Sequence, residues 1–267
     1  MANLTELPAK QRRAKLELLY KAGATTFEEI GLARAKKTKP TGYVIWESPT
    51  MVSIATMEST NDKTGNMIQI WFLLKDQHPL DVVSSGLDAE TICTGCPFAS
   101  GNGCYVNVGQ APVMIWKTYH NGRYPKLDPV DYSKIFGGRK VRFGAYGNPS
   151  ILPISMVKAI AEASAGWTGY FHDWADMAPE TAKMYGQYFM ASTDTEESRC
   201  QAEEKGLRYF HVSEIQPEGT RECLADTMDL ECQECLLCQG TTKSRQLPIW
   251  INPHGSKRKK AVLASQG

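Results

Sequence analysis

The sequence lacks several features that would point to common classes of protein. It has no run of about 18 apolar residues, the length that spans a bilayer, and no apolar secretory segment near residue 1. It contains no P-loop, no G-x-G-x-x-G and no G-x-S-x-G motif, so P-loop phosphoryl transfer, Rossmann redox chemistry and serine hydrolysis have no support. We therefore expect a protein of the cytoplasm with no membrane partner.

A strong charge of one sign is also lacking. The net charge is +1 over 267 residues, so the overall field does not favour nucleic acid or membrane. Basic residues gather near the two ends, within residues 10–15, 34–39 and 257–260. We expect these to be solvated surfaces; the alternative is that the basic ends contact the phosphate backbone of a nucleic acid.

The length is sufficient for one α/β domain of barrel size or for two small domains. Residues 1–40 predict two helices, and residues 42–57 and 67–74 predict strands joined by a turn at 61–66. We divide the sequence into three regions. They are 1–90, with N-terminal helices and a β-hairpin; 91–215, a βα-repeat core with the first cysteine loop; and 216–267, with a C-terminal cysteine group and basic tail.

Strands and helices alternate after residue 104. Strands are expected at 140–144, 168–172, 189–192 and 207–212, and helices at 112–120, 153–165, 179–188 and 194–205. Helices that begin at proline and end at glycine between short apolar strands indicate βα units, which build a parallel sheet. Four strands are too few for a complete TIM barrel. The predicted fold is therefore α/β, with a partial (βα) barrel-like parallel sheet and a C-terminal cysteine-rich metal-binding extension.

Polar residues follow each predicted strand, at the edge where the chemistry of such folds lies. The expected catalytic residues are Tyr146, Asn148, His172 and Asp194, and the expected cofactor contacts are Gly144 and Ser192. Singly, each polar residue can instead be part of a turn or a cap. Asp194 is the best example, since it precedes a predicted helix and suits an N-cap.

Seven of the eight cysteines fall into two groups. The first group is Cys93, Cys96 and Cys104, and the second is Cys223, Cys232, Cys235 and Cys238. In a reducing compartment grouped cysteines are more often metal ligands or catalytic thiols than disulfides. The eighth, Cys200, lies in a predicted amphipathic helix and is expected to be a small core residue.

The spacing of the second group is similar to the ferredoxin run that binds a cubane, with Cys223 as the fourth ligand. A [4Fe–4S] cluster is favoured there, and zinc is the alternative because zinc also accepts four cysteines. The first group has no neighbouring histidine, so a tetrahedral zinc would lack a ligand. A [4Fe–4S] cluster on three cysteines would instead leave one iron open for a substrate or S-adenosylmethionine. If Cys223 completed the first group, a structural or electron-transfer role would follow.

Several segments between residues 90 and 255 resemble bacteriophage proteins of the "gene product eighty-eight" type. They are the Cys93-x-x-Cys96-Pro loop with Gly103-Cys104-Tyr105, the strand Val141-Arg142-Phe143, the segment Ala191-Ser192-x-Asp194, and the terminal cysteine run with the following Pro253-His254-Gly255. His254 is expected to be a turn residue or a ligand. Where those proteins carry Gly-Asp, this chain has Gly147-Asn148. The resemblance implies a phage-encoded protein of the host cytoplasm.

The layout also resembles the radical S-adenosylmethionine enzymes, which have a partial βα barrel, a three-cysteine loop and a C-terminal auxiliary cluster. Their usual loop is C-x3-C-x2-C, whereas this chain has C-x2-C-x7-C. The resemblance implies reductive cleavage of S-adenosylmethionine and hydrogen abstraction from a small-molecule or nucleotide substrate. The alternative hypothesis is a non-enzymatic module, stabilised by zinc or an iron–sulfur cluster, that binds nucleic acid or a host protein.

Overall fold

The computed structural model describes residues 40–241 and 247–253, together with residues 11, 14, 17 and 262. The predicted helices of residues 1–40, His254 and the basic tail lie outside the described residues, apart from those single positions. Contacts divide the chain into two compact units, Met1–Pro40 and Thr41–Gly267. Within the described residues, no helix has both the length and the apolar character needed to cross a bilayer.

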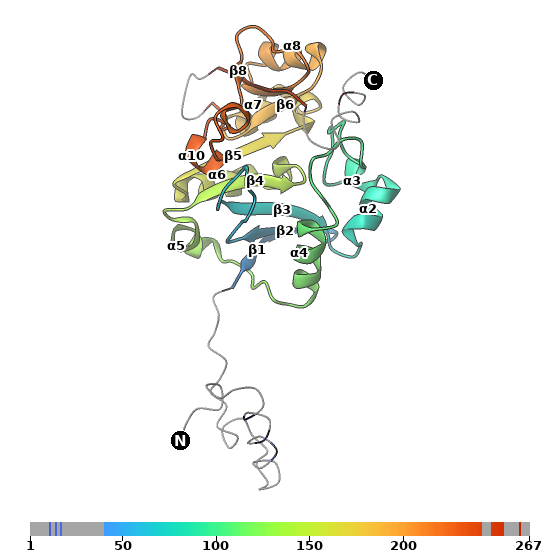
Figure 1. The fold of residues 1–267 in the computed structure, drawn as a ribbon, viewed down its shortest axis with the longest axis vertical. Coiled ribbons are helices and arrows are strands. Elements are labelled where there is room, and N and C mark those ends of the chain that lie inside the picture. The colour runs from blue at the N-terminus through green and yellow to red at the C-terminus, as the bar shows by residue number, and fades with distance from the viewer. Residues whose placement is uncertain are drawn as a thin grey trace. The chain divides into compact units, whose positions relative to one another are not determined.

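A nine-stranded sheet forms the centre of the second unit (Figure 1). The strands in spatial order are β1 (Gly42–Glu47), β2 (Met51–Thr56), β3 (Ile68–Leu74), β4 (Lys140–Tyr146), β5 (Gly166–Phe171), β6 (Met190–Thr193), β7 (Tyr209–Val212), β9 (Ile249–Ile251) and β8 (Arg221–Glu222). The first three strands are antiparallel, and every pairing from β3 onward is parallel. The α/β prediction is confirmed in this form; β1 and β8 stand at the two ends of the order, and a closed barrel is not shown.

The predicted helices of the βα region are present with bounds that differ by a few residues. They are α4 (Ala111–His120), α6 (Ile154–Ala163), α7 (Pro179–Gly186) and α8 (Glu196–Glu204). The short helices α2 (Pro79–Ser85), α3 (Leu87–Glu90) and α5 (Tyr132–Phe136) were not predicted, nor were the strands β8 and β9. These elements are only two to seven residues long, too short to establish a hydrophobic period.

The start of α8 differs from the prediction by one residue. Thr195, and not Asp194, is the N-cap: its hydroxyl accepts from the backbone N–H of Ser198 at 3.0 Å, and the Ser198 hydroxyl reaches back to the cap. The expected cap role of Asp194 is therefore wrong. Cys200, on the same helix, is exposed, so its expected place in the core is wrong as well.

The parallel part of the sheet has two distinct faces, because side chains alternate along each strand. Phe143, Phe171 and Phe189 pack together on one face, where Tyr185 of α7 covers them. On the opposite face Tyr170 packs on Phe210, beside Met190, Ile249 and the cysteines Cys223 and Cys238. We call these the helix-covered face and the cysteine-bearing face.

Candidate metal centres

The chain brings the seven grouped cysteines together as two separate sets. All eight cysteines lie in the described part of the chain, and none forms a disulfide. Cys93, Cys96 and Cys104 are close enough for their charges to act on one another. Cys223 interacts in the same way with Cys232, Cys235 and Cys238, so it belongs with the second set and not with the first.

The first cysteine loop lies at the carboxyl ends of β4 and β5, where hydrogen bonds to Asp88 and a close backbone contact at Gly95 fix it. The Asp88 carboxylate, 2% exposed, accepts from the backbone N–H of Ser100 at 2.9 Å and from its hydroxyl at 2.7 Å. Gly95 has φ +72° and packs so closely on β5 that an added Cβ would stand 2.7 Å from the carbonyl oxygen of His172. Only glycine allows this approach.

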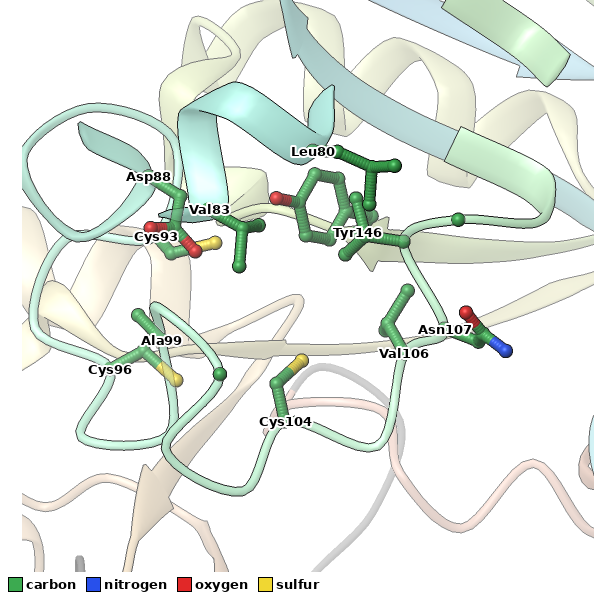
Figure 2. Close-up of a pocket in the computed structure, with 13 residues that line it drawn as sticks. Leu80, Val83, Asp88, Cys93, Cys96, Ala99, Cys104, Val106, Asn107 and Tyr146 are labelled. Carbon is green, nitrogen blue, oxygen red and sulfur yellow. The ribbon is translucent and has the colours of Figure 1, made fainter. Parts of the chain in front are cut away.

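The three cysteines of the loop line one cavity of about 220 Å³. Figure 2 shows their sulfur atoms around the same hollow, with the ring of Tyr146 on the far side. The rest of the lining is mostly apolar and comes from α2, from the loop and from the segment after it: Leu80, Val83, Ala99, Val106 and Val108. Asp88 and Asn107 add the polar side chains. Apart from Cys93, Cys96 and Cys104, the described lining contains no cysteine and no histidine.

Backbone N–H groups point at two of these sulfurs. Phe98 and Ala99 donate to Cys96 Sγ, and Gly147 donates to Cys93 Sγ. Burial, with the neighbouring thiols, nevertheless raises the pKa of Cys93 well above its ordinary value and that of Cys96 to about 12. The thiols alone are therefore protonated at neutral pH, and a metal must displace their protons to bind.

Tyr146 presents an unpaired hydroxyl group to the cavity. Its side chain is 3% exposed, and Oη finds no hydrogen-bond partner among the described residues. Burial raises the pKa of this phenol, followed by the charges of Cys93, Asp88 and Cys104. A buried hydroxyl without a partner is costly, so this group is suited to bind whatever fills the cavity.

Two further predicted residues border the first set. Burial raises the pKa of Asp194 to about 6, and the charge of its carboxylate acts on Cys96. Burial, and then the charge of Arg142, lower the pKa of His172 to about 4, so this imidazole is neutral at pH 7. The carboxyl end of the sheet thus brings Tyr146, His172 and Asp194 around the first cysteine loop.

The other three predicted site residues, Asn148, Gly144 and Ser192, take part in contacts that stabilise the fold. Asn148 is 1% exposed, and its side-chain amide donates to the carbonyl oxygen of Thr94 in the cysteine loop. Gly144 has φ +69°, and an added Cβ would stand 2.8 Å from the carbonyl oxygen of Gly147, so it permits the turn after β4. The Ser192 carbonyl oxygen accepts from the Trp174 indole at 2.9 Å. Catalytic or cofactor roles for these three remain predictions.

The second cysteine set lies against the sheet, and strands far apart in the sequence hold it. The backbone N–H of Cys232 donates to the Lys63 carbonyl at 2.8 Å, that of Gly169 to the Cys238 carbonyl at 3.2 Å, and that of Cys223 to the Trp250 carbonyl at 2.9 Å. The buried guanidinium of Arg208 donates to the carbonyl oxygens of residues 237 and 239 at 2.7 and 2.6 Å.

Burial is also the main cause of the raised thiol pKa values in the second set. It raises the pKa of Cys238 to about 12, while a hydrogen bond from the Tyr170 hydroxyl opposes that shift. It also raises the pKa values of Cys223 and Cys232, with Arg142 opposing the shift at Cys232. The Arg142 cation and the Tyr170 hydroxyl thus favour the thiolate forms of Cys232 and Cys238, whereas burial alone would keep these sulfurs protonated.

The number and kind of the donors in the two sets can be compared with what a zinc ion and an iron–sulfur cluster require. In the described part of the chain, no group of three or more His, Cys, Asp or Glu side chains is arranged to hold one metal ion. A zinc ion draws every sulfur ligand to about 2.3 Å. Each cysteine of a [4Fe–4S] cluster binds a different iron, so its sulfurs stand further apart. Sets of three and four cysteines with backbone N–H donors fit that chemistry.

Comparisons of the chain with models of protein families, with curated proteins and with solved structures found no match.

Sequence reasoning gave no role to several residues that the structure brings to these centres. Asp88 precedes the cysteine loop, and nothing in its surroundings distinguishes it from a surface aspartate. Arg142 did carry a signal, because a charged residue stands between Val141 and Phe143 in an apolar strand. Its 5% exposure shows that this charge is inside the protein.

Proposed function

We propose that this chain is an iron–sulfur enzyme with chemistry similar to that of the radical S-adenosylmethionine enzymes. Cys93, Cys96 and Cys104 would hold a [4Fe–4S] cluster with one open iron, and the second cysteine set would hold an auxiliary cluster. The observation that carries the proposal is the convergence of three cysteines, with no fourth cysteine or histidine in the described lining, on a cavity of about 220 Å³.

An open-iron cluster, when bound, supplies electrons for the reductive cleavage of S-adenosylmethionine. The chain's own residues prepare the site for such a reaction. The apolar side chains of Leu80, Val83 and Val106 limit the access of water to the cavity. The backbone donors to Cys93 and Cys96 stabilise negative charge on sulfur.

Asp194 and His172 are suited to handle protons at the edge of this site. With a pKa of about 6, Asp194 can take up or release a proton near neutral pH. His172 is uncharged at that pH and can accept a hydrogen bond from a substrate. A small-molecule or nucleotide substrate with exchangeable hydrogens would suit these two groups.

The test uses full-length protein purified without oxygen. Iron, sulfide and zinc are measured per chain, and EPR spectra of the dithionite-reduced protein are recorded with and without S-adenosylmethionine. We expect about eight irons, four for each cysteine set, and a spectrum that changes when S-adenosylmethionine is added. Zinc alone, or an iron signal that ignores S-adenosylmethionine, would contradict the proposal and favour the non-enzymatic binding module.

A further inference from the structure

Arg142 is a buried cation that no carboxylate of the described residues neutralises. It stands in β4 with 5% of its surface exposed, and no acidic side chain of the described chain forms a salt bridge with it. A buried charge is strongly unfavourable unless an opposite charge lies next to it. A negative charge next to Arg142 would therefore offset the cost of burying its guanidinium.

The nearest side chains are two tyrosines, which do not supply that anion. Arg142 Nη2 donates to the Tyr105 hydroxyl at 3.2 Å, and the guanidinium carbon lies 4.3 Å from the centroid of the Tyr170 ring. Phenols are uncharged at neutral pH, and a cation–π contact offsets only part of the cost of burying a cation.

The second cysteine set lies next to Tyr170, whose ring packs against Cys238 and contacts the guanidinium. The charge of Cys232 acts on Arg142, and Tyr170, whose ring the guanidinium contacts, donates its hydroxyl to Cys238. Two residues earlier in β4, the Lys140 ammonium donates to the carbonyl oxygen of Gln233, next to Cys232. Arg142 and the second set therefore share the cysteine-bearing face.

The second set gains its full negative charge only when a metal binds, because cysteine ligates metals as the thiolate and releases its proton on binding. Four thiolates around a doubly charged centre leave a net charge of about −2, whether the centre is a zinc ion or an oxidised [4Fe–4S] core. Such a centre would give Arg142 the anion that the described protein side chains do not.

We propose that Arg142 is the counter-ion of a dianionic four-thiolate metal centre at Cys223, Cys232, Cys235 and Cys238. Through the Tyr105 hydroxyl it also ties this centre to the first cysteine loop, since Tyr105 directly follows Cys104. The inference rests on the proposed function only in requiring that the second set binds a metal, and it holds for zinc as well as for iron.

The charge of Arg142 should then destabilise the metal-free protein and stabilise the metal-loaded protein. In the metal-free protein the guanidinium is an unpaired buried charge, so Arg142→Met should raise the melting temperature above that of the wild type. In the loaded protein the same change removes the counter-ion, so the metal should be lost faster. Arg142→Lys keeps the charge and should resemble the wild type in both states.

The experiment compares full-length wild type, Arg142→Met and Arg142→Lys, each in a Cys96→Ala background so that the retained metal belongs to the second set. The melting temperature is measured for metal-free and reconstituted protein, and metal release is followed in excess EDTA. We expect at least tenfold faster release from Arg142→Met. If the second set binds a cluster, its reduction potential should be lower in Arg142→Met than in the wild type. Each tenfold decrease in the equilibrium constant for one-electron reduction of the cluster corresponds to about 59 mV.

Each result separates this inference from the proposed function. Equal metal release and equal metal-free melting temperatures for wild type and Arg142→Met would overturn the inference while leaving the iron–sulfur enzyme intact. Zinc in place of iron, still released faster from Arg142→Met, would support the inference and contradict the auxiliary cluster of the proposed function. No metal in the Cys96→Ala protein would overturn the inference and the auxiliary cluster together, and would leave the first cysteine set to the test given under the proposed function. If Arg142→Met does not fold, Arg142→Gln, which keeps donors without the charge, serves in the same comparison.

Discussion

The side-chain amide of Asn148 donates to the carbonyl oxygen of Thr94 over 3.3 Å, while its backbone N–H donates to the carbonyl oxygen of Ile92 over 2.6 Å. These two bonds hold the residues on either side of Cys93. The segment after β4 therefore fixes the first cysteine directly, and the geometry of the first cysteine site depends on the turn that carries Asn148.

Replacing a single cysteine should distinguish the two sets. Cys96→Ala should lower the iron content from about eight to about four per chain and abolish the effect of S-adenosylmethionine on the EPR spectrum, because each set binds its own cluster. Cys200→Ala is the matched control, since this thiol is exposed on α8 and belongs to neither set. Full iron content in Cys96→Ala would sink the assignment of the first set.

Removing the unpaired hydroxyl of Tyr146 should have effects that depend on the contents of the cavity. Tyr146→Phe should stabilise the metal-free protein by about 1 kcal/mol, because a buried donor without a partner disappears. In the loaded protein it should be destabilising by a similar amount. Chemical denaturation of both forms measures the difference.

Tyr132 of α5 provides the control for this change. Its hydroxyl is also buried without a partner among the described residues, but it does not line the cavity. Tyr132→Phe should therefore stabilise the metal-free and loaded proteins equally. Equal effects of Tyr146→Phe in the two forms would show that its hydroxyl contacts nothing in the cavity.

The close approach of Gly95 to β5 can be tested against a glycine of similar backbone conformation. Gly101→Ala places a side chain at φ +77° with no atom within 4 Å of the new Cβ, and should cost about 1–2 kcal/mol. Gly95→Ala, at φ +72°, should cost about 1–3 kcal/mol more, because its Cβ meets the backbone of His172. Urea denaturation and iron content of the two variants provide the comparison. Equal stability and equal loading would mean that the loop does not depend on this contact.

Acid should destabilise the protein through His211. This side chain is 3% exposed, its Nδ1 lies 2.9 Å from the Thr193 hydroxyl, and burial followed by the charge of Arg199 lowers its pKa to about 4, while Glu196 opposes the shift. The unfolded chain takes up the proton near pH 6.5 and the folded protein only near pH 4. The contribution of His211 to stability is therefore complete above pH 6.5 and falls as the pH drops to 4.

The loss through His211 should be about 3 kcal/mol at most, from about 1.4 kcal/mol per unit of pKa difference. Denaturation curves between pH 4 and 7 for the wild type and His211→Gln measure it. The variant should show a shallower decline over this range. Parallel curves for the two proteins would exclude His211 as the source.

The sequence predicted the elements whose pattern is long and locally determined. The βα order after residue 104 and the extended segments 42–57 and 67–74 follow from apolar period and from glycine and proline at the ends, and they are present. The turn that divides 42–57 into β1 and β2 was not predicted. The division of the cysteines into sets of three and four also followed from their spacing. The carboxyl ends of the strands, as expected, bring Tyr146, His172 and Asp194 to one edge.

What the sequence left open depends on contacts between distant residues. The N-cap of α8 depends on whether the side-chain oxygen of Asp194 or that of Thr195 accepts from the first turn of the helix. Because Thr195 does so, the carboxylate of Asp194 is available to the site. The burial of Arg142 depends on Tyr105, Tyr170 and the terminal cysteine run, which meet only when the sheet has formed. β9 is three residues long, and its place beside β7 comes from pairing and not from its own pattern.

The strand order also determines when each cysteine set can be completed during synthesis of the chain. β9 is the last described strand to be synthesised, yet it lies between β7 and β8, and the Cys223 backbone bonds to Trp250 within it. The contacts described here for the first cysteine loop are complete once residue 194 has been made, whereas the second set lacks this partner until residue 250. A nascent chain can therefore assemble its first cysteine site while the second is still incomplete.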